Sequence, residues 1–372
     1  MSYKKQLFTY KKPYDLNATN NLFLKAMQEN CAYQYEHCED YKRILDEKGF
    51  HPGDLKEYVD LEKLPFIPTL YFKQHALFSM PSGRMLIKAT SSGTSGKRTQ
   101  MGFNFSSLYR GLRMVLTVGK YHHLFSLKPS HYLVFGYEPN ITNKIVFSKT
   151  AYGFTYFAPA LSRAYALKYT KEGYRLDLEN LKQKFVKYSK SKAPVRTIGF
   201  PAYTYFLLKQ MQEEGIKVQL PKGSIMTLGG GWKQFYAQKV SKEEFYTLVD
   251  EILGIDEQHI FEFFGAVEHP ILYTDCRCHH FHIPVYARVM IHDVDTLQPV
   301  ENGQVGLVNL MTPMVDSVPI LSIMTDDLGI LHTEKCPCGV DAPWLEILGR
   351  VGIKDIVTCA AGADAMLHAQ DN

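Results

Sequence analysis

The chain has 372 residues, of which 45% are hydrophobic and 22% charged, and its formal net charge at pH 7 is +4. These values are typical of a globular protein with a substantial core, and so small a net charge gives no reason to expect nucleic acid as a partner. No apolar run approaches the roughly 18 residues of a membrane span, and the polar start lacks the apolar stretch of a secretory signal. We therefore expect a cytoplasmic protein without a membrane anchor, whose seven cysteines are thiols, metal ligands or nucleophiles rather than disulfides.

Residues 1–80 are predicted to form a helical N-terminal layer. Apolar residues recur at helical spacing over residues 17–38, and a second helix is expected over residues 38–48. Cys31 and Cys38 are expected to pack there as small hydrophobic side chains. A proline-punctuated extended segment at residues 64–69 ends the layer.

Residues 81–269 are predicted to form an α/β body. Helices are expected at residues 106–120, 177–190 and 203–214, and short apolar strands at residues 132–136, 195–199 and 225–228. This alternation is typical of a mostly parallel sheet, in which ligands bind at the carboxyl ends of the strands.

The pattern changes from about residue 270. Apolar runs at residues 286–291, 306–310 and 320–325 predict a β-rich subdomain over residues 270–350. Residues 351–372 are expected to form a short mobile tail.

A loop of hydroxyls, glycines and one lysine precedes the first strand of the body. Glycine lets backbone N–H groups converge on an anion, hydroxyls add donors, and the lysine supplies a point charge for phosphate. Gly93 and Gly96 are spaced differently from the glycines of a Walker loop, and a flexible Ser/Gly surface loop is the alternative. The stretch is Thr90, Ser91, Ser92, Gly93, Thr94, Ser95, Gly96 and Lys97.

Four further stretches follow in order: Gly229-Gly230-Gly231-Trp232-Lys233, Phe263-Phe264-Gly265-Ala266-Val267-Glu268, Thr325-Asp326-Asp327-Leu328-Gly329 and Gly349-Arg350. An aromatic plate can stack a purine, and a carboxylate can hold Mg²⁺ near phosphates. The two aspartates are expected at the end of a strand, where they suit a ribose diol. Each has a structural alternative: Phe264 as core, Asp327 as a turn residue and Arg350 in a surface ion pair.

This order of motifs resembles the adenylate-forming (acyl-adenylate ligase) superfamily. Four features narrow the resemblance to the acyl-protein synthetase (LuxE-like) family. They are the Gly229 to Lys233 stretch, Ile198-Gly199-Phe200-Pro201-Ala202-Tyr203, Pro284-Val285-Tyr286-Ala287-Arg288 and the short tail. The resemblance implies the α/β fold of the large N-terminal domain, with two α/β subdomains and a smaller β-rich one. Superfamily ligases continue for a further mobile domain carrying a catalytic lysine; we expect that domain to be absent here, and Lys354 is not assigned its role.

The resemblance also implies roles for individual residues. Ser91 to Lys97 would hold the β- and γ-phosphates of ATP, and Glu268 would bind Mg²⁺. Asp327 would bind the ribose, and Arg350 would contact ribose or phosphate. The residues that would enclose adenine and border the acyl pocket are Gly229, Gly230, Gly231, Phe264 and Gly265. Asp326 stands where the superfamily usually has glycine. Cys359 resembles the C-terminal cysteine with which acyl-protein synthetases accept the acyl group as a thioester, a reaction that suits a thiolate nucleophile. The catalytic candidates are thus Cys359, Lys97 and Glu268, and an idle cysteine is the alternative for Cys359.

Two tight groups of soft ligands remain, Cys276-Arg277-Cys278-His279-His280-Phe281-His282 and Cys336-Pro337-Cys338-Gly339. Zn²⁺ prefers four such ligands, often two from each of two segments, although Cys336 and Cys338 are closer in sequence than in the usual knuckle. Similarity to phenylacetate-CoA-ligase-like proteins implies a structural zinc. The favoured ligands are Cys276, either His280 or His282, Cys336 and Cys338, with Cys278 as a substitute; a buried cluster without metal is the alternative.

The predicted function is ATP- and Mg²⁺-dependent conversion of a carboxylic acid, fatty or aryl, to acyl-AMP. Transfer to Cys359 would follow, and then delivery to an acyl-accepting partner such as an acyl reductase. One alternative is a phenylacetate-type ligase that uses free CoA. An alternative of another class is a non-catalytic nucleotide-binding scaffold of a reductase complex.

Overall fold

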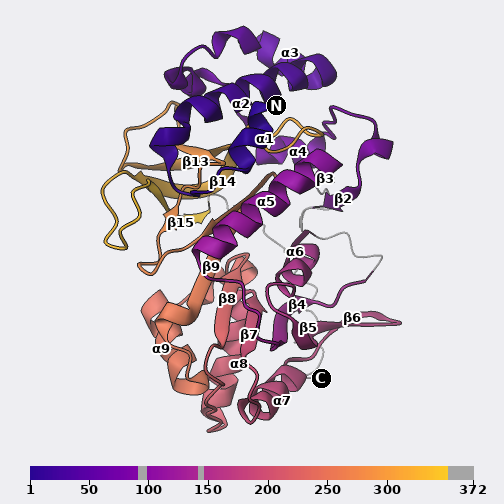
Figure 1. The fold of residues 1–372 in the computed structure, drawn as a ribbon, viewed down its shortest axis with the longest axis vertical. Coiled ribbons are helices and arrows are strands. Elements are labelled where there is room, and N and C mark those ends of the chain that lie inside the picture. Colours follow the sequence, from indigo (N-terminus) through magenta and orange to yellow (C-terminus); the bar gives the residue numbers. More distant parts are fainter. Residues whose placement is uncertain (91–98, 141–145, 351–372) are drawn as a thin grey trace. The chain divides into compact units, whose positions relative to one another are not determined.

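The computed structural model describes residues 1–90, 99–140 and 146–350 (Figure 1). These residues divide into two compact units. The first contains residues 1–90, 99–122 and 265–350, and the second contains residues 123–140 and 146–264. The α/β class expected from the sequence is confirmed. In the part of the chain that is described, no helix is both long enough and apolar enough to cross a membrane.

The first unit begins with the predicted helical layer. Cys31 and Cys38 are buried thiols, as expected. The Asp15 side chain accepts a hydrogen bond from the N–H of Ala18, and Asn104 accepts one from Ser107, which satisfies N–H groups that a helix start leaves open. The helices of this unit are α1 (Tyr3–Phe8), α2 (Leu16–His37), α3 (Glu39–Glu47), α4 (Thr69–Gln74) and α5 (Phe105–Tyr121), with 3-10 turns η1 (Pro52–Asp54), η2 (Tyr58–Lys63) and η3 (Ser82–Arg84).

The first unit also contains the β-rich part of the chain. Its sheet has the order β11-β15-β14-β13-β12, with antiparallel neighbours, and β1 joins β14 in parallel. A separate hairpin joins β2 to β3. The bounds are β1 (Ile67–Pro68), β2 (Ile87–Thr90), β3 (Gln100–Phe103), β10 (His269–Thr274), β11 (Phe281–His282), β12 (Arg288–His292), β13 (Val305–Met311), β14 (Ser322–His332) and β15 (Trp344–Arg350).

The prediction that a strand ends at the Asp326-Asp327 pair is wrong. Strand β14 continues to His332, and Asp327 pairs with Arg350 of β15. Aspartates followed by glycine are typical of turns, but pairing with β15 keeps this segment extended. A Cβ on Gly329 would lie 2.6 Å from the Glu346 carbonyl oxygen, so the glycine is required by the close approach of β15.

The second unit is built on a mostly parallel sheet, as predicted. Within this unit the order is β9-β8-β7-β4-β5-β6, in which the pairs from β9 to β5 are parallel and the pair β5–β6 is antiparallel. The strands are β4 (Ser130–Tyr137), β5 (Ala160–Thr170), β6 (Gly173–Leu176), β7 (Val195–Gly199), β8 (Ile225–Gly229) and β9 (Ile260–Ala266). The helices are α6 (Val146–Phe154), α7 (Leu178–Ser189), α8 (Pro201–Glu213) and α9 (Lys242–Leu253), with η4 (Lys233–Gln238) and η5 (Glu257–His259).

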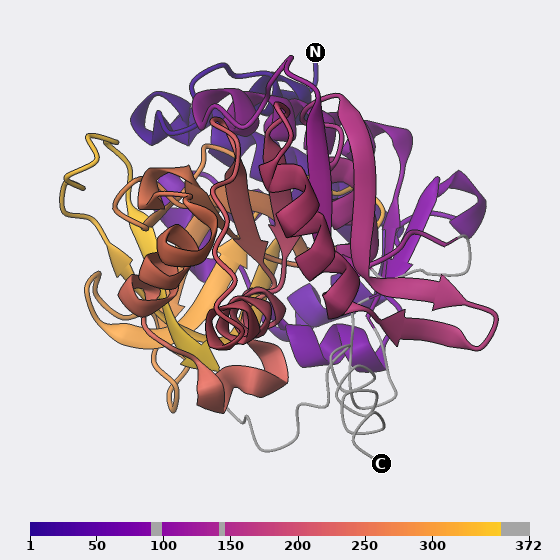
Figure 2. The ribbon, with the colours of Figure 1, turned by 90° about the horizontal axis from the view of Figure 1, so that it is seen from below.

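Helices cover both faces of this sheet (Figures 1 and 2). Side chains of α7, α8 and α9 form one buried cluster with Leu133 and Phe135 of β4. Val134, between them, belongs to a smaller cluster with Ala151 of α6. Successive residues of a strand point to opposite faces, so the centre of β4, from Tyr132 to Phe135, is a continuous apolar run because both of its faces are buried.

A buried charge network ties three distant segments of the first unit together. Asp316 lies 2.7 Å from Lys4 Nζ and 2.6 Å from Arg110 Nη2, and all three residues are buried. Lys4 also donates to Asn30, and Arg110 Nε donates to the Met314 carbonyl. Burial alone would raise the pKa of Asp316, but the two cations outweigh it and hold this pKa below its usual value.

Asp316→Asn is expected to lower the free energy of unfolding by about 3 kcal/mol at pH 7, because two buried cations lose their counter-charge. Because the pKa of Asp316 is lower in the folded than in the unfolded protein, its ionised form stabilises the fold above the unfolded pKa. This stabilisation is lost as the pH falls through the folded pKa, so the difference in stability between Asp316→Asn and wild type should shrink below about pH 4. Urea unfolding at several pH values measures both effects. Asp40→Asn, which breaks only an exposed pair with Arg43, is the control and should change little. Equal stability of Asp316→Asn and wild type would contradict the prediction.

Candidate functional site

Three consecutive glycines lie at the carboxyl end of β8 in the second unit: Gly229 is the last residue of the strand, and Gly230 and Gly231 follow it. Gly229 pairs with Phe263 of β9, and a Cβ on Gly229 would lie 3.7 Å from the Phe263 carbonyl oxygen. Gly230 and Gly231 have φ values of 81° and 67°, a region that favours glycine. A Cβ on Gly231 would meet no atom within 4 Å. The turn therefore leaves room for a ligand to approach the backbone closely.

The aromatic pair of the second unit has two different environments. The Phe263 ring stacks on Phe154 of α6, with centroids 4.7 Å apart and planes at 15°. Phe264 follows it on the strand and therefore points to the other face of the sheet. Phe264 is half-buried, and it is the residue of the pair that the sequence assigned to the nucleotide.

Glu268 is a buried carboxylate in the first unit, only 6% exposed. Burial raises its pKa, while the neighbouring Thr99 side chain and the charges of Lys73 and Arg350 act in the opposite direction. Because burial penalises the charged form, the site favours a cation that would restore it. Thr99 and Lys73 were not predicted from the sequence. Thr99 lies just beyond the Gly/Ser loop, and nothing in the sequence around Lys73 distinguishes this lysine.

Asp327 and Arg350 meet across β14 and β15. Arg350 Nε donates to Asp327 Oδ1 at 2.9 Å, and Asp327 is buried while the Arg350 side chain is 42% exposed. The backbone N–H of Asp327 donates to the Thr325 hydroxyl, which itself donates to the Val308 carbonyl. Arg350 therefore interacts electrostatically with two other predicted site residues of the first unit, Asp327 and Glu268.

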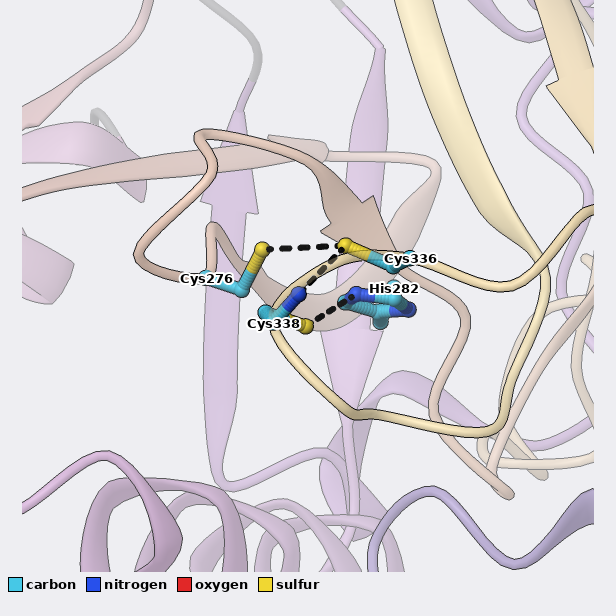
Figure 3. A group of neighbouring side chains, drawn as sticks. All are labelled: Cys276, His282, Cys336 and Cys338. Atoms are coloured by element: carbon cyan, nitrogen blue, oxygen red, sulfur yellow. Dashed lines mark hydrogen bonds between the residues drawn. The ribbon is translucent and has the colours of Figure 1, made fainter.

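The two Cys/His segments come together in the first unit, in a cluster of four side chains (Figure 3). One potential ligand atom from each of Cys276, His282, Cys336 and Cys338 lies within 4.8 Å of all the others. The Sγ atoms of Cys276 and Cys336 are 3.8 Å apart. Two sulfurs at about 2.3 Å from one zinc ion with tetrahedral angles would be about 3.8 Å apart, so the spacing fits this metal.

Hydrogen bonds around the cluster also suit a metal site. His282 Nδ1 lies 2.9 Å from the Ala342 carbonyl oxygen, which can only accept, so Nδ1 carries the proton. His282 Nε2 is then free of hydrogen and lies 3.2 Å from Cys338 Sγ. Backbone N–H groups of Cys278 and Val340 donate to the sulfurs of Cys276 and Cys338. Such second contacts orient zinc ligands and stabilise thiolates.

His280, the other candidate histidine, lies differently. Its ring stacks on Trp344 with centroids 3.6 Å apart, and His332 stacks on the opposite face of the same indole at 3.7 Å. His280 Nδ1 is 3.3 Å from Cys336 Sγ. His280 therefore lies beside the four-ligand cluster, and Cys278 is likewise outside it.

Two predicted site elements, Ser91 to Lys97 and Cys359, lie outside the residues that the structure describes.

The fold is shared with solved adenylate-forming ligases. A crystal structure of 2-hydroxyisobutyryl-CoA ligase in the postadenylation state, with 2-HIB-AMP, matches with a TM-score of 0.68 at 17% identity, covering 92% of this chain and 70% of that one. An open conformation of the same ligase, in complex with 2-HIB-AMP and CoA, also has a TM-score of 0.68. This likeness places the chain in the adenylate-forming ligase fold class.

Sequence comparison identifies the family. The long-chain-fatty-acid–luciferin-component ligase of Aliivibrio fischeri is 25% identical over 339 residues, covering 90% of this chain and 86% of the relative. The ligase of the same name from Vibrio harveyi is 26% identical over 370 residues, covering 96% and 92%. Phenylacetate-coenzyme A ligase of Thermus thermophilus is 25% identical over 330 residues, covering 85% and 67%. The profile of the acyl-protein synthetase LuxE family matches residues 6–367. The chain belongs to this family of ligases, and the resemblance seen in the sequence is confirmed.

Proposed function

We propose that this ligase uses ATP to convert a fatty acid to acyl-AMP, transfers the acyl group to Cys359, and delivers it to an acyl-accepting partner protein of the acyl reductase kind. The observation that carries the proposal is the family match over residues 6–367. The names of the relatives from Aliivibrio fischeri and Vibrio harveyi support a fatty acid over an aryl acid. The buried Glu268 carboxylate supports a nucleotide-linked cation in the first unit.

The reaction proceeds in two balanced steps. A carboxylate oxygen of the acid forms a bond to the α-phosphorus of ATP, and the bond to the β-phosphate oxygen breaks to release pyrophosphate. The Cys359 thiolate then attacks the acyl carbonyl carbon, and the bond to AMP breaks. Lys97 neutralises phosphate charge, and Asp327 and Arg350 hold the ribose and its phosphate. Gly230 and Gly231 let the backbone approach the base.

The chain has residues that are suited to binding two different metal ions. Glu268, with its charged form penalised by burial, would hold Mg²⁺, which neutralises phosphate charge when bound. Cys276, His282, Cys336 and Cys338 would hold zinc, and three thiolates with one imidazole leave no open position for a substrate. We therefore assign the zinc a structural role. His282 rather than His280 is the histidine ligand in this proposal, because the Ala342 carbonyl fixes its tautomer.

The test is the intact mass of the protein after incubation with ATP, Mg²⁺ and a panel of fatty and aryl acids. Wild type should gain a hydroxylamine-labile acyl adduct, and the acid that gives it identifies the substrate. Cys359→Ala should lose the adduct completely but retain acid-dependent pyrophosphate exchange. Cys278→Ser, a matched cysteine variant outside the proposed ligand set, should retain both.

Other outcomes select the alternatives. Pyrophosphate exchange without an adduct, together with acyl-CoA formation when CoA is added, would establish a phenylacetate-type ligase. The relative from Thermus thermophilus makes that the second candidate. No exchange with any acid would indicate a non-catalytic nucleotide-binding scaffold.

A further inference from the structure

A cavity of about 570 Å³ lies at the amino ends of β4 and β5 in the second unit. Its walls come from residues 125–127, just before β4, and residues 156–160, just before β5. The backbone N–H of Ser126 donates to the Phe157 carbonyl and joins the two segments. Neighbouring strands from β8 to β5 are parallel, so this cavity and the turn at Gly229 to Gly231 lie at opposite edges of the sheet. The volume falls within the roughly 300–1,000 Å³ typical of pockets for small molecules.

The walls of the cavity are mostly apolar. The rings of Phe125 and Phe157 are in contact, with centroids 4.6 Å apart, and Leu127 and Tyr156 are 95% and 64% exposed. Among the described residues that line the cavity there is no aspartate or glutamate. Large apolar side chains left in contact with water gain free energy when an apolar ligand covers them.

Arg163 is the charged residue of the lining, and neutral groups hold it in place. Its Nε donates to the Thr155 hydroxyl at 2.8 Å, and its Nη2 donates to the Thr155 carbonyl at 3.4 Å. The guanidinium carbon lies 5.6 Å from the ring centre of Tyr152 and 5.2 Å from that of Tyr156. In the part of the chain that the structure describes, Arg163 makes no ion pair. Its orientation is therefore fixed, while three of its five N–H groups remain available to a ligand.

A second guanidinium lies behind the cavity wall. Arg196 of β7 is buried, and its Nη2 donates to the Leu124 carbonyl. Burial raises the pKa of Tyr132, and the charges of Arg196 and Arg163 both oppose this rise. The Tyr132 hydroxyl in turn hydrogen-bonds to the backbone of Ala158 in the wall. Two cations thus act on one wall of the cavity, and within the described residues Arg196 has no ion-pair partner either.

We propose that this cavity is a binding site for a carboxylic acid with an apolar tail, in which Arg163 binds the carboxylate and the aromatic walls cover the tail. A guanidinium with available N–H groups favours an anion, and its planar geometry matches a carboxylate. The site is distinct from the acyl pocket of the proposed reaction, which the glycines at the other edge of the sheet would border. That the bound acid is also the substrate rests on the proposed function; the existence of the site does not.

The test is isothermal titration calorimetry of the full chain with decanoate, below the concentration at which decanoate forms micelles. A saturating decyl ester of AMP is added to occupy the acyl-adenylate site of the proposed reaction. One equivalent of decanoate should still bind. Arg163→Met should raise the dissociation constant about tenfold, because a charge-assisted hydrogen bond is lost. Decan-1-ol, which has the same tail without the charge, should bind about tenfold more weakly than decanoate.

Two further variants keep the test independent of folding effects. Leu127→Asp, at a side chain that is 95% exposed, should weaken decanoate binding because it adds a carboxylate to the lining. Arg175→Met, on an exposed arginine of β6 outside the cavity, is the matched control and should bind as wild type does. All three variants should retain pyrophosphate exchange. A decanoic acid with a photoreactive diazirine on its tail should label residues 125–127 or 156–160, as peptide mass spectrometry would show.

Each remaining outcome overturns the proposal. Decanoate binding that is absent in wild type or unchanged in both Arg163→Met and Leu127→Asp would do so, as would decan-1-ol that binds as tightly as decanoate. Labelling confined to other segments would place the acid elsewhere. Sedimentation with vesicles of anionic phospholipid that Leu127→Asp abolishes, without binding of decanoate, would assign this face to a membrane. Failure of pyrophosphate exchange in wild type, with Arg163-dependent binding of decanoate retained, would instead reject only the proposed function.

Discussion

Cys336→Ser is expected to leave the purified protein without stoichiometric zinc and to lower the stability of the first unit by at least about 5 kcal/mol. Cys336 belongs to a four-residue cluster that joins the turn before β11 to the turn before β15. Losing the metal would leave buried thiols and an imidazole without the ion that organises them. Elemental analysis gives the metal content, and thermal unfolding with and without a chelator gives the loss of stability.

Two neighbouring variants make this prediction specific. Cys278→Ser and His280→Ala should keep the metal, whereas His282→Ala should lose it, because only His282 belongs to the four-ligand cluster. Trp344, one of two tryptophans and stacked between His280 and His332, should report metal loss as a change in fluorescence. Wild-type protein that contains no zinc, or that is insensitive to chelation, would reject the structural metal.

Glu268→Gln is expected to reduce acid-dependent pyrophosphate exchange by about a thousandfold, because the proposed Mg²⁺ ligand loses its charge. The same substitution should leave the melting temperature unchanged or raise it. Burial raises the pKa of Glu268, so the empty folded protein bears the cost of the ionised carboxylate, and a neutral amide of the same shape removes that cost. Opposite effects on activity and stability are typical of a functional group rather than a structural one.

The comparison needs a carboxylate that is not part of the site. Glu334→Gln, on an exposed carboxylate paired with His332, should change exchange by less than about twofold. Raising the Mg²⁺ concentration should recover part of the activity of Glu268→Gln if the residue binds the metal. An unfolded Glu268→Gln variant, or one with normal exchange, would contradict the assignment.

The elements that the sequence predicted are those whose local pattern agrees with their packing. Strands β4, β7 and β8 are rich in apolar residues because they lie inside the sheet and helices cover both of its faces. Strand β5 was not predicted: its first half alternates between exposed and half-buried residues and carries Ser162 and Arg163, so its apolar signal is diluted. The length of β14 depended on pairing with β15, a contact that a single strand does not encode.

The same distinction applies to the candidate site. The cysteines and histidines could be recognised by their spacing, but our proposal of His282 over His280 depends on the Ala342 carbonyl, sixty residues away from His282 in the chain. Burial of Glu268, and the contribution of Thr99 and Lys73 to its environment, likewise arise from tertiary contacts. A sequence shows which residues could act as ligands, nucleophiles or charged groups, whereas their ionisation and geometry depend on the fold.

The Lys4–Asp316 ion pair has a consequence for the order of events during synthesis. Its partners are 312 residues apart in the chain, and the first unit takes residues from both sides of the second. The described residues of the second unit, 123–140 and 146–264, all precede Asp316 in the chain and therefore leave the ribosome before it. The ion pair between Lys4 of the N-terminal helices and Asp316 cannot form until Asp316 has been synthesised. Contacts this distant slow folding, so we expect the N-terminal layer to stay accessible to chaperones and proteases until the rest of the first unit has been synthesised.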